Sequence, residues 1–477
     1  MNQAKSVIIR SLLSVAMLAG CSQGPEGPAG AGTPGKEGLP GPTGATGPDG
    51  GPGDPGEVGP PGPAGPTKAR LLDCKQPYWT KDVRDAINKM ITEKGITSPT
   101  FDAKVPPVAV FDWDNTVLKN DIGDATFFWM IQHDKIRRPA DWKSTNAALS
   151  DAGAAALSAA CDGAAAVGAP IPTSATPACA AELAKIYDSG KTHAAVTVGS
   201  TTYAAGTAAW NTPLTSKINQ QYAWVAQLTA GWTPTEMRSF ATQAYEENST
   251  NPEATTQTIG GVTGYTHWVR IYTQMDDLIG ALQANGFDVW ILTASPQYFV
   301  DAISHHVGVD PDHVIGIRSV ISGGKGTYDV EDCGGAAKNS LITFDEGKRC
   351  WINKVIWNEP VENQLKVNTA AKRPVFVAGD SDTDIAMLKD ATTLKVVLNR
   401  GKIQTVCNAY ESIDKKDGRW VVQPMFIRPR AKATSDYGCV TADQPGTTTK
   451  IVNETGAVFT KNYPDTVFEL GPISACP

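Results

Sequence analysis

Histidine and cysteine are both scarce in this chain of 477 residues, which has six histidines and nine cysteines. No Cys-x-x-Cys pair occurs, so a structural zinc site is not expected. Past the N-terminus, no apolar run approaches the roughly 20 residues that a membrane-spanning helix needs. Positive charge is limited too, because 42 lysines and arginines face 49 aspartates and glutamates, giving a net charge of −7. Without a basic stripe, nucleic acid is not expected as a partner.

The first 20 residues have the pattern of a secretory signal. Lys5 and Arg10 precede the short apolar stretch Ser11–Leu18, and small residues lead from there to Cys21. The run Leu-Ala-Gly-Cys resembles a bacterial lipobox, which implies cleavage before Cys21 and a lipid on its thiol. An ordinary signal peptide followed by a chance cysteine is the alternative. The predicted location is the cell envelope, with a membrane anchor in the outer membrane or at the cell surface if the source is Gram-negative.

Glycine and proline dominate residues 21–67. Glycine recurs at every third position from Gly24 to Gly30, and again from Gly32 to Gly65. This period is the collagen signature, because only glycine fits at the axis of three wound chains. We expect a collagen-like stalk that makes the protein a homotrimer, with a disordered spacer as the alternative.

Two short valine-rich runs are each followed directly by an acidic motif. Val108–Phe111 precedes Asp-Trp-Asp-Asn-Thr at 112–116, and Val375–Ala378 precedes Gly-Asp-Ser-Asp-Thr-Asp at 379–384. Such runs are typical of buried parallel strands. Because active sites of open α/β sheets lie at the carboxyl ends of strands, we expect both motifs at one edge of a sheet. A pocket of carboxylates there needs a cation, and hard oxygen ligands favour Mg²⁺.

Strands and helices alternate along the rest of the chain, from residue 68 to residue 477. Phe287–Leu292, Val314–Ile317 and Leu394–Leu398 are predicted to be further strands. Apolar spacing before Asn285-Gly286 predicts a helix that ends there. The alternation predicts an α/β domain with a doubly wound parallel sheet.

The motifs and their order resemble those of the haloacid dehalogenase superfamily. The matching elements are Asp112-x-Asp-x-Thr116, Thr293 after an apolar strand, a downstream lysine, and Gly379-Asp-Ser-x-x-Asp384. Within the superfamily, the chain is similar to bacterial secreted phosphorylcholine phosphatases and, more distantly, to phosphoserine phosphatases. The resemblance implies a phosphatase with a large, mainly helical cap inserted after the first motif, at about residues 119–265.

The first two motifs suggest how a phosphate ester would be cleaved. Asp112 would be the nucleophile that forms an aspartyl-phosphate. Asp114 lies two residues on, so in an extended chain it points the same way, as a general acid and then a general base. Thr116 would order the loop and contact the phosphate, and Thr293 would bind the phosphoryl oxygens. The second aspartate favours phosphate chemistry, because dehalogenases lack it.

The remaining motifs supply positive charge and metal ligands. A lysine must balance the charge on the phosphoryl oxygens, and Lys354 is the first candidate, with Lys348 as the alternative. Asp380 would bind Mg²⁺, whereas Asp384 would bind it through water or hold the lysine. The resemblance adds Asp112 and Asp114 to the predicted Mg²⁺ site.

The expected substrate is a small extracellular phosphate ester, with phosphorylcholine first. Aromatic rings beside carboxylates attract a quaternary ammonium through cation–π interactions, and the predicted cap is rich in both, although most of these rings also fit a core. The alternatives are a phosphatase for other small phosphate esters and a non-catalytic adhesin displayed on the stalk. The cap residues considered are Asp121, Asp124, Phe127, Phe128, Trp129, Trp142, Tyr203, Trp210, Tyr222, Trp224, Trp232 and Tyr245.

Export implies an oxidising compartment, in which disulfides persist. With Cys21 lipidated, eight cysteines remain and could form four bridges. The plausible local pairs are Cys161 with Cys179 and Cys333 with Cys350. The pairing of the other four stays open at this stage; they are Cys74, Cys407, Cys439 and Cys476.

Overall fold

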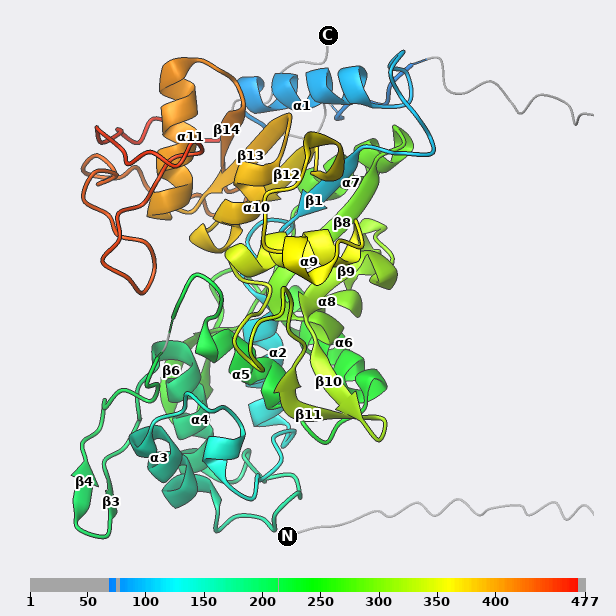
Figure 1. The fold of residues 1–477 in the computed structure, drawn as a ribbon. Coiled ribbons are helices and arrows are strands. Elements are labelled where there is room, and N and C mark those ends of the chain that lie inside the picture. Colours follow the sequence, from blue (N-terminus) through cyan, green and yellow to red (C-terminus); the bar gives the residue numbers. More distant parts are fainter. Residues whose placement is uncertain (1–67, 74–77, 213, 471–477) are drawn as a thin grey trace, which may run out of the picture. The chain divides into compact units, whose positions relative to one another are not determined.

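The computed structural model describes residues 68–73, 78–212 and 214–470 (Figure 1). The predicted signal peptide (1–20), Cys21 and the collagen-like stalk (21–67) lie outside the described residues. Cys74 and Cys476 do as well. Among the helices in the described ranges, none is both long and apolar enough to cross a membrane.

A six-stranded parallel sheet forms the centre of the domain, which confirms the predicted α/β class. β1 lies inside the sheet, and the chain winds from it through β8 to β9, then through β12 and β13 to β14 on the other side. The winding therefore reverses between β1 and β12. In spatial order the strands are β14 (Trp420–Pro424), β13 (Leu394–Asn399), β12 (Phe376–Gly379), β1 (Val108–Phe111), β8 (Asp288–Pro296) and β9 (Val314–Ile317).

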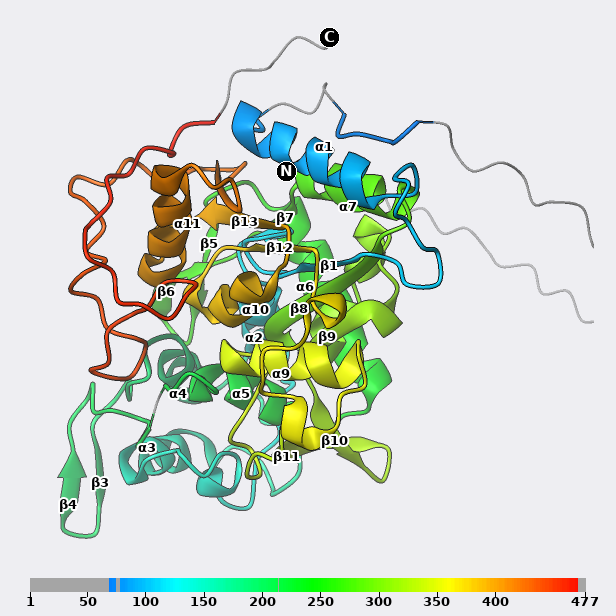
Figure 2. The ribbon, with the colours of Figure 1, turned by 45° about the horizontal axis from the view of Figure 1, so that its top comes forward.

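Helices cover both faces of the sheet (Figure 2). α1 (Lys81–Lys94) and α7 (Thr273–Ala284) pack against one face, where Ala109 and Phe111 point. α9 (Glu346–Val355) and α10 (Ile385–Asp390) pack against the other face, where Val108 and Val110 point. Because side chains alternate along a strand, all four residues of β1 are buried. The predicted helix before Asn285-Gly286 is α7, and Asn285 is the residue that ends it.

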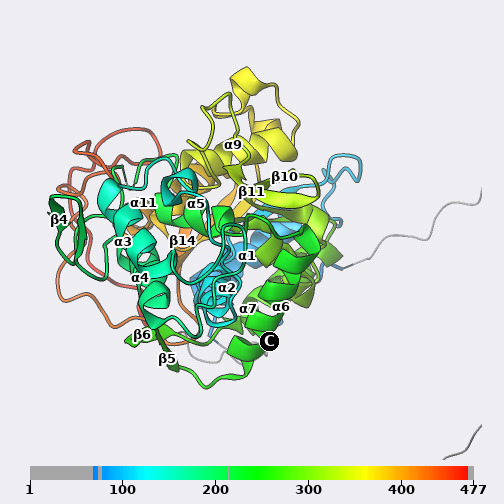
Figure 3. The same cartoon turned by 90° about the horizontal axis from the view of Figure 1, so that it is seen from below.

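An insertion separates the first acidic motif from the rest of the sheet. It begins and ends at β2 (Leu118–Lys119) and β7 (Arg270–Ile271), which pair antiparallel. Its apolar side chains form a core of their own, and Figure 3 shows its helices from below. The insertion comprises α2 (Ile122–Gln132), α3 (Asp151–Cys161), α4 (Pro177–Ser189), β3 (Val196–Val198), β4 (Thr201–Tyr203), α5 (Gln220–Gln227), α6 (Pro234–Thr250), β5 (Thr256–Ile259) and β6 (Val262–Thr266).

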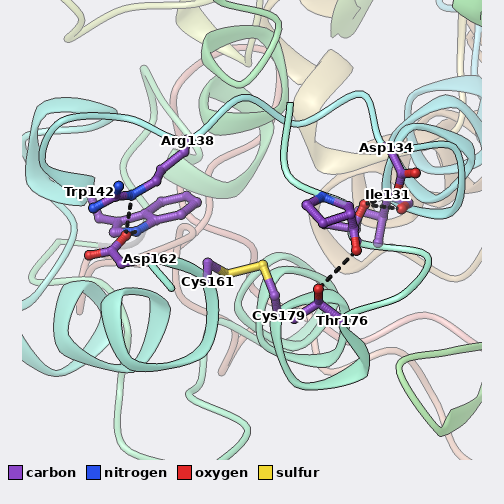
Figure 4. The surroundings of a disulfide bond; sticks show 10 residues. Ile131, Asp134, Arg138, Trp142, Cys161, Asp162, Thr176 and Cys179 are labelled. Atoms are coloured by element: carbon purple, nitrogen blue, oxygen red, sulfur yellow. Dashed lines mark hydrogen bonds and ion pairs between the residues drawn. A yellow bond between two sulfur atoms is a disulfide. The ribbon is translucent and has the colours of Figure 1, made fainter. Parts of the chain in front are cut away.

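Three disulfides occur among the described cysteines. Cys161–Cys179 joins the end of α3 to the start of α4 (Figure 4). Beside it, Asp162 Oδ1 accepts hydrogen bonds from Trp142 Nε1 at 2.9 Å and from Arg138 Nε at 3.3 Å. Cys333–Cys350 is the second predicted pair. The third bridge, Cys407–Cys439, was left open by the sequence.

The chain beyond β14 packs back onto the domain. Cys407 lies in α11 (Ile403–Lys415), and its disulfide ties this helix to the segment that follows β14. Tyr410 of α11 and Tyr437, Phe459 and Tyr463 of that segment belong to one apolar cluster. We call residues 425–470 the C-terminal segment. Shorter elements outside the sheet and the insertion are α8 (Gln297–Asp301), β10 (Ser319–Ser322) and β11 (Lys325–Val330).

Candidate active site

The two acidic motifs meet where the winding of the sheet reverses. β1 and β12 pair in parallel, with Phe111 opposite Ala378, and the Asp112 amide donates to the Ala378 carbonyl at 3.0 Å. One carboxylate oxygen from each of Asp112, Asp380 and Asp384 lies within 4.8 Å of the others, and all three residues are buried. The predicted convergence of the motifs at one edge of the sheet is therefore observed, at the position where open α/β sheets bind ligands.

Both loops have residues that their tight geometry requires. Asn115 has a φ of 62°, a left-handed conformation that asparagine tolerates better than most residues. Gly379 ends β12, where a Cβ atom would lie 2.7 Å from Cβ of Asp384. This close approach lets Asp384 Oδ2 accept from the amides of Asp380 and Ser381, both at 3.0 Å. Thr116 Oγ1 donates to Asp112 Oδ2 at 3.1 Å and lies 3.3 Å from Asp380 Oδ1.

Lys348 is the lysine of this site. Its ammonium donates to Asp112 Oδ1 and to Asp384 Oδ1, both at 2.6 Å, and to the carbonyl of Leu292 at 3.0 Å. The side chain is fully buried, at 0% exposure. Its two carboxylate partners raise the pKa of Lys348 above its ordinary value, against the effect of burial. The ammonium is therefore charged at neutral pH.

The first prediction for this lysine, Lys354, is wrong. Lys354 lies in the last turn of α9, where its ammonium donates to the carbonyl of Asp332 at 3.0 Å and lies 4.1 Å from the ring centre of Trp351. The two lysines are six positions apart in sequence, which places them roughly 120° apart around a helix at about 100° per residue. Only Lys348, near the start of α9, faces the end of the sheet.

Asp114 lies among hydroxyl and amide donors. Its Oδ2 accepts from Ser295 Oγ at 2.7 Å and from Thr293 Oγ1 at 3.2 Å, and its Oδ1 accepts from the Ile122 amide at 2.7 Å. Thr293 is buried and also accepts from the Ser295 amide at 3.0 Å. Thr293 therefore lies at the site as predicted, with Asp114 as its partner, and Ser295 is an additional residue that the sequence did not single out.

The site holds more negative charge than its own cations balance. Burial raises the pKa values of Asp112, Asp114 and Asp380; nearby Asp384 raises that of Asp112 further, and Asp121 that of Asp114. The four predicted aspartates carry four formal charges when ionised, whereas Lys348 and the paired Arg400 carry two positive charges. The excess of carboxylates over positive groups and the all-oxygen donor set fit a divalent cation such as Mg²⁺.

A pocket opens over Asp112 and Asp114. Asp121 from the N-cap of α2, Tyr187 from α4, Tyr222 from α5 and Arg400 after β13 line it. Asp124 lies next to it and accepts a hydrogen bond from the Tyr187 hydroxyl. Tyr187 and Arg400 were missed in the sequence, because neither belongs to a recognisable motif.

Most aromatic residues considered for substrate binding are core residues. Those that pack in the core of the insertion are Phe127, Phe128, Trp129, Trp142, Trp210, Trp224 and Trp232. Only Tyr222 of the set lines the pocket over Asp112. Among the described residues, the aromatic side chains that line this pocket are therefore those of Tyr187 and Tyr222.

A known protein-family model matches part of the chain. Residues 228–389 match the family model described as haloacid dehalogenase-like hydrolase. The chain is similar to haloacid dehalogenase-like hydrolases over this range, which is less than half of its length. The matched range includes Thr293, Lys348, Asp380 and Asp384. It starts after Asp112, which the insertion separates from the other motifs. The match supports the expectation of a hydrolase.

No curated protein matches the chain. Among solved structures, a protein of unknown function from Anaerococcus prevotii DSM 20548 is 18% identical, with 72% of this chain and 93% of that chain covered and a TM-score of 0.45. A protein of unknown function from Bordetella pertussis Tohama I is 16% identical, covering 67% and 98%, with a TM-score of 0.35. A phospho-aspartyl intermediate analogue of phosphoserine phosphatase is 15% identical, covering 68% and 95%, with a TM-score of 0.29.

Proposed function

We propose that the protein is an Mg²⁺-dependent phosphomonoesterase that works through an aspartyl-phosphate. The observation that carries this proposal is the pair of aspartates that follows β1, the buried Asp112 and the half-buried Asp114. Asp112 faces a buried lysine and the carboxylates of the second motif, whereas Asp114 faces neutral donors. Two adjacent carboxylates in such different surroundings suit two different roles, a nucleophile and an acid–base group.

In the proposed first step, a carboxylate oxygen of Asp112 attacks phosphorus and the bond to the leaving oxygen breaks. Asp114, whose raised pKa favours the protonated form, gives its proton to that leaving oxygen. In the second step, Asp114 takes a proton from a water molecule that attacks the same phosphorus. Inorganic phosphate leaves, and the carboxylate of Asp112 is restored.

The other residues of the site hold these groups in place. Lys348 donates to Oδ1 of Asp112, and Thr116 donates to Oδ2 of the same carboxylate. We assign Asp384 to positioning, because its two oxygens already accept from Lys348 and from two backbone amides. Asp112 and Asp380, with the backbone of Asp114, would hold the Mg²⁺, which supplies positive charge against the phosphate when bound.

The substrate we propose first is phosphorylcholine, as one of a class of small phosphate esters with a cationic group. Asp121, Asp124, Tyr187 and Tyr222 support this choice, because they bring carboxylates and phenol rings to the pocket next to Asp114. Other small phosphate esters are the alternative, and a panel of esters with and without a cationic group distinguishes the two.

We also propose that the domain is displayed outside the cell. The sequence supports export through residues 1–20, lipid attachment at Cys21 and trimer formation through the collagen-like stalk. The insertion, at residues 119–265, would act as the cap over the pocket. The alternative is a non-catalytic adhesin. An adhesin has no need of a buried Lys348 paired with two carboxylates, so this cluster favours the enzyme.

Hydrolysis of p-nitrophenyl phosphate by the purified protein tests the function. We expect turnover with Mg²⁺, loss of turnover with EDTA, and recovery when Mg²⁺ is added back. Asp112→Asn should abolish turnover and leave the far-ultraviolet circular dichroism unchanged. A folded wild-type protein that hydrolyses none of the phosphate esters, with or without Mg²⁺, would favour the adhesin.

A further inference from the structure

The pocket over Asp112 has a single positively charged side chain among the described residues that line it. Four carboxylates face the pocket, those of Asp112, Asp114, Asp121 and Asp380, and the positive side chain is Arg400. Lys348 does not line the pocket. Its ammonium already donates to two carboxylates and a carbonyl, which uses the three N–H groups of a lysine. Among the described residues that line this pocket, Arg400 is therefore the one that offers positive charge to an anionic phosphate.

The guanidinium of Arg400 is paired with one carboxylate and is partly exposed. Its Nη1 donates to Asp380 Oδ2 at 2.7 Å, and its side chain is 36% exposed. In the described part of the chain, no other hydrogen bond of this guanidinium is present. A guanidinium has several N–H groups in one plane, and two of them can bind a phosphate together. Arg400 has donors left for this task.

The C-terminal segment fixes the residue that precedes Arg400. Asn399, the last residue of β13, is buried, and its Nδ2 donates to the carbonyl of Val467 at 2.7 Å and to Asp465 Oδ1 at 3.2 Å. Asn399 Oδ1 in turn accepts from the Gly401 amide at 3.0 Å. The two neighbours of Arg400 in the chain are thus joined to each other and to the C-terminal segment.

Asp465 is the centre of this support. Its side chain is fully buried, and its Oδ1 accepts from the Tyr410 hydroxyl at 2.9 Å. Its Oδ2 accepts from Arg430 Nη1 at 2.5 Å and from the Ala433 amide at 2.9 Å. A buried carboxylate with this many donors is rigid. Asp465 contacts Asn399, the residue that precedes Arg400 in the chain.

We propose that Arg400 binds the phosphate group of the substrate, and that Asp465 positions Arg400 through Asn399. This inference rests on the proposed phosphatase function and adds two residues to it. Arg400 is a substrate-binding residue, whereas Asp465 acts only through Asn399 and is a positioning residue. The C-terminal segment is then a part of the active site, although none of its residues lines the pocket in the described part of the chain.

The test uses the full chain with Mg²⁺ and inorganic phosphate as the probe. Isothermal titration calorimetry gives the phosphate Kd, and p-nitrophenyl phosphate gives KM and kcat. Arg400→Gln should raise the phosphate Kd and the KM by about tenfold or more, because a charge-assisted hydrogen bond is lost. Arg400→Lys should recover part of the loss. The matched control is Arg419→Gln, which removes an exposed arginine that also pairs with a carboxylate, at the other end of β13 and β14.

Asp465→Asn tests the positioning role. We expect the phosphate Kd and the KM to rise several-fold while kcat changes less than twofold, a split that general destabilisation does not produce. If this variant does not fold, Tyr410→Phe replaces it, because it removes one hydrogen bond to the same carboxylate.

Each outcome decides a different part of the proposal. A phosphate Kd within twofold of wild type in folded Arg400→Gln would overturn the role of Arg400. Unchanged values in the folded Asp465 or Tyr410 variant would overturn the positioning role. A wild-type protein without any esterase activity would instead contradict the proposed function itself.

Discussion

Replacing Lys348 with methionine should remove nearly all activity and strongly destabilise the domain. Methionine has a similar length and no charge, so the substitution tests the ammonium rather than the packing. In the structure this ammonium is fully buried between Asp112 and Asp384, at 2.6 Å from each. The variant leaves two buried carboxylates without their shared cation. The Lys354→Met variant is the matched control, because Lys354 lies on the same helix outside the site.

The expected magnitudes follow from burial and from the number of contacts. Removing one partner of a buried ion pair lowers the free energy of unfolding by about 3–5 kcal/mol. Losing the group that holds the Asp112 carboxylate in its reactive position lowers kcat by about 10²-fold or more. Lys354 makes one hydrogen bond, to the Asp332 carbonyl, and one cation–π contact, to Trp351. Its loss should lower the free energy of unfolding by only about 1–2 kcal/mol.

The assay pairs chemical denaturation with the rate of p-nitrophenyl phosphate hydrolysis for both variants and the wild type. Circular dichroism before each assay shows whether the variant is folded. A folded Lys348→Met protein with a kcat within threefold of wild type would refute the assignment. So would a Lys354→Met protein that loses as much activity as Lys348→Met.

Three further outcomes are expected. Asp114→Asn should lower kcat by about 10²-fold or more, because it removes the proton donor; steady-state kinetics with a good leaving group should show a smaller loss than with an alkyl ester. Burial and Asp121 raise the pKa of Asp124 in the folded protein. The free energy of unfolding therefore falls as pH rises from the pKa of Asp in the unfolded chain, about 3.9, through the raised pKa of the folded state. Asp124→Asn should therefore raise the Tm at pH 8 and not at pH 3, and a lower Tm at pH 8 would contradict this reasoning. Deleting residues 24–67 should convert a trimer into monomers with unchanged turnover per site, as measured by light scattering; a deletion variant that remains trimeric would exclude the stalk as the assembly element.

The sheet was predictable because its strands are short apolar runs, several of which are followed directly by acidic or hydroxyl residues of the site. Val108–Phe111 and Phe287–Leu292 lie almost where β1 and β8 lie, and each is followed by residues of the site. β14 was not predicted. It is formed by Trp420–Pro424, and no acidic or hydroxyl motif follows it to mark the end of a strand.

The choice between Lys348 and Lys354 depends on the phase of a helix, which the apolar pattern alone did not fix. α9 begins after Asp345, whose φ is 44°, and Gly347 lies so close to the carbonyl of Ile342 that a Cβ atom would be 1.7 Å from that oxygen. This start places Lys348 toward the sheet. The sequence suggests a helix here, but the contact that sets its orientation comes from a residue in the preceding loop.

The pocket residues beyond the motifs could not be predicted for a related reason. Tyr187 and Arg400 are more than 200 positions apart in the chain, and both lie at the pocket only because the insertion and the end of β13 come together there. Asp465 is farther still and reaches the site through Asn399. Such contacts depend on tertiary packing, so single-sequence patterns do not reveal them.

Identification of the phosphorylated residue tests the central claim most directly. During turnover with Mg²⁺, rapid borohydride treatment reduces an aspartyl-phosphate to homoserine, and peptide mass spectrometry locates the change. We predict homoserine at position 112 in the wild-type protein and none in the Asp112→Asn variant. An enzyme that turns over under these conditions with homoserine at another position, or with none at 112, would contradict the account.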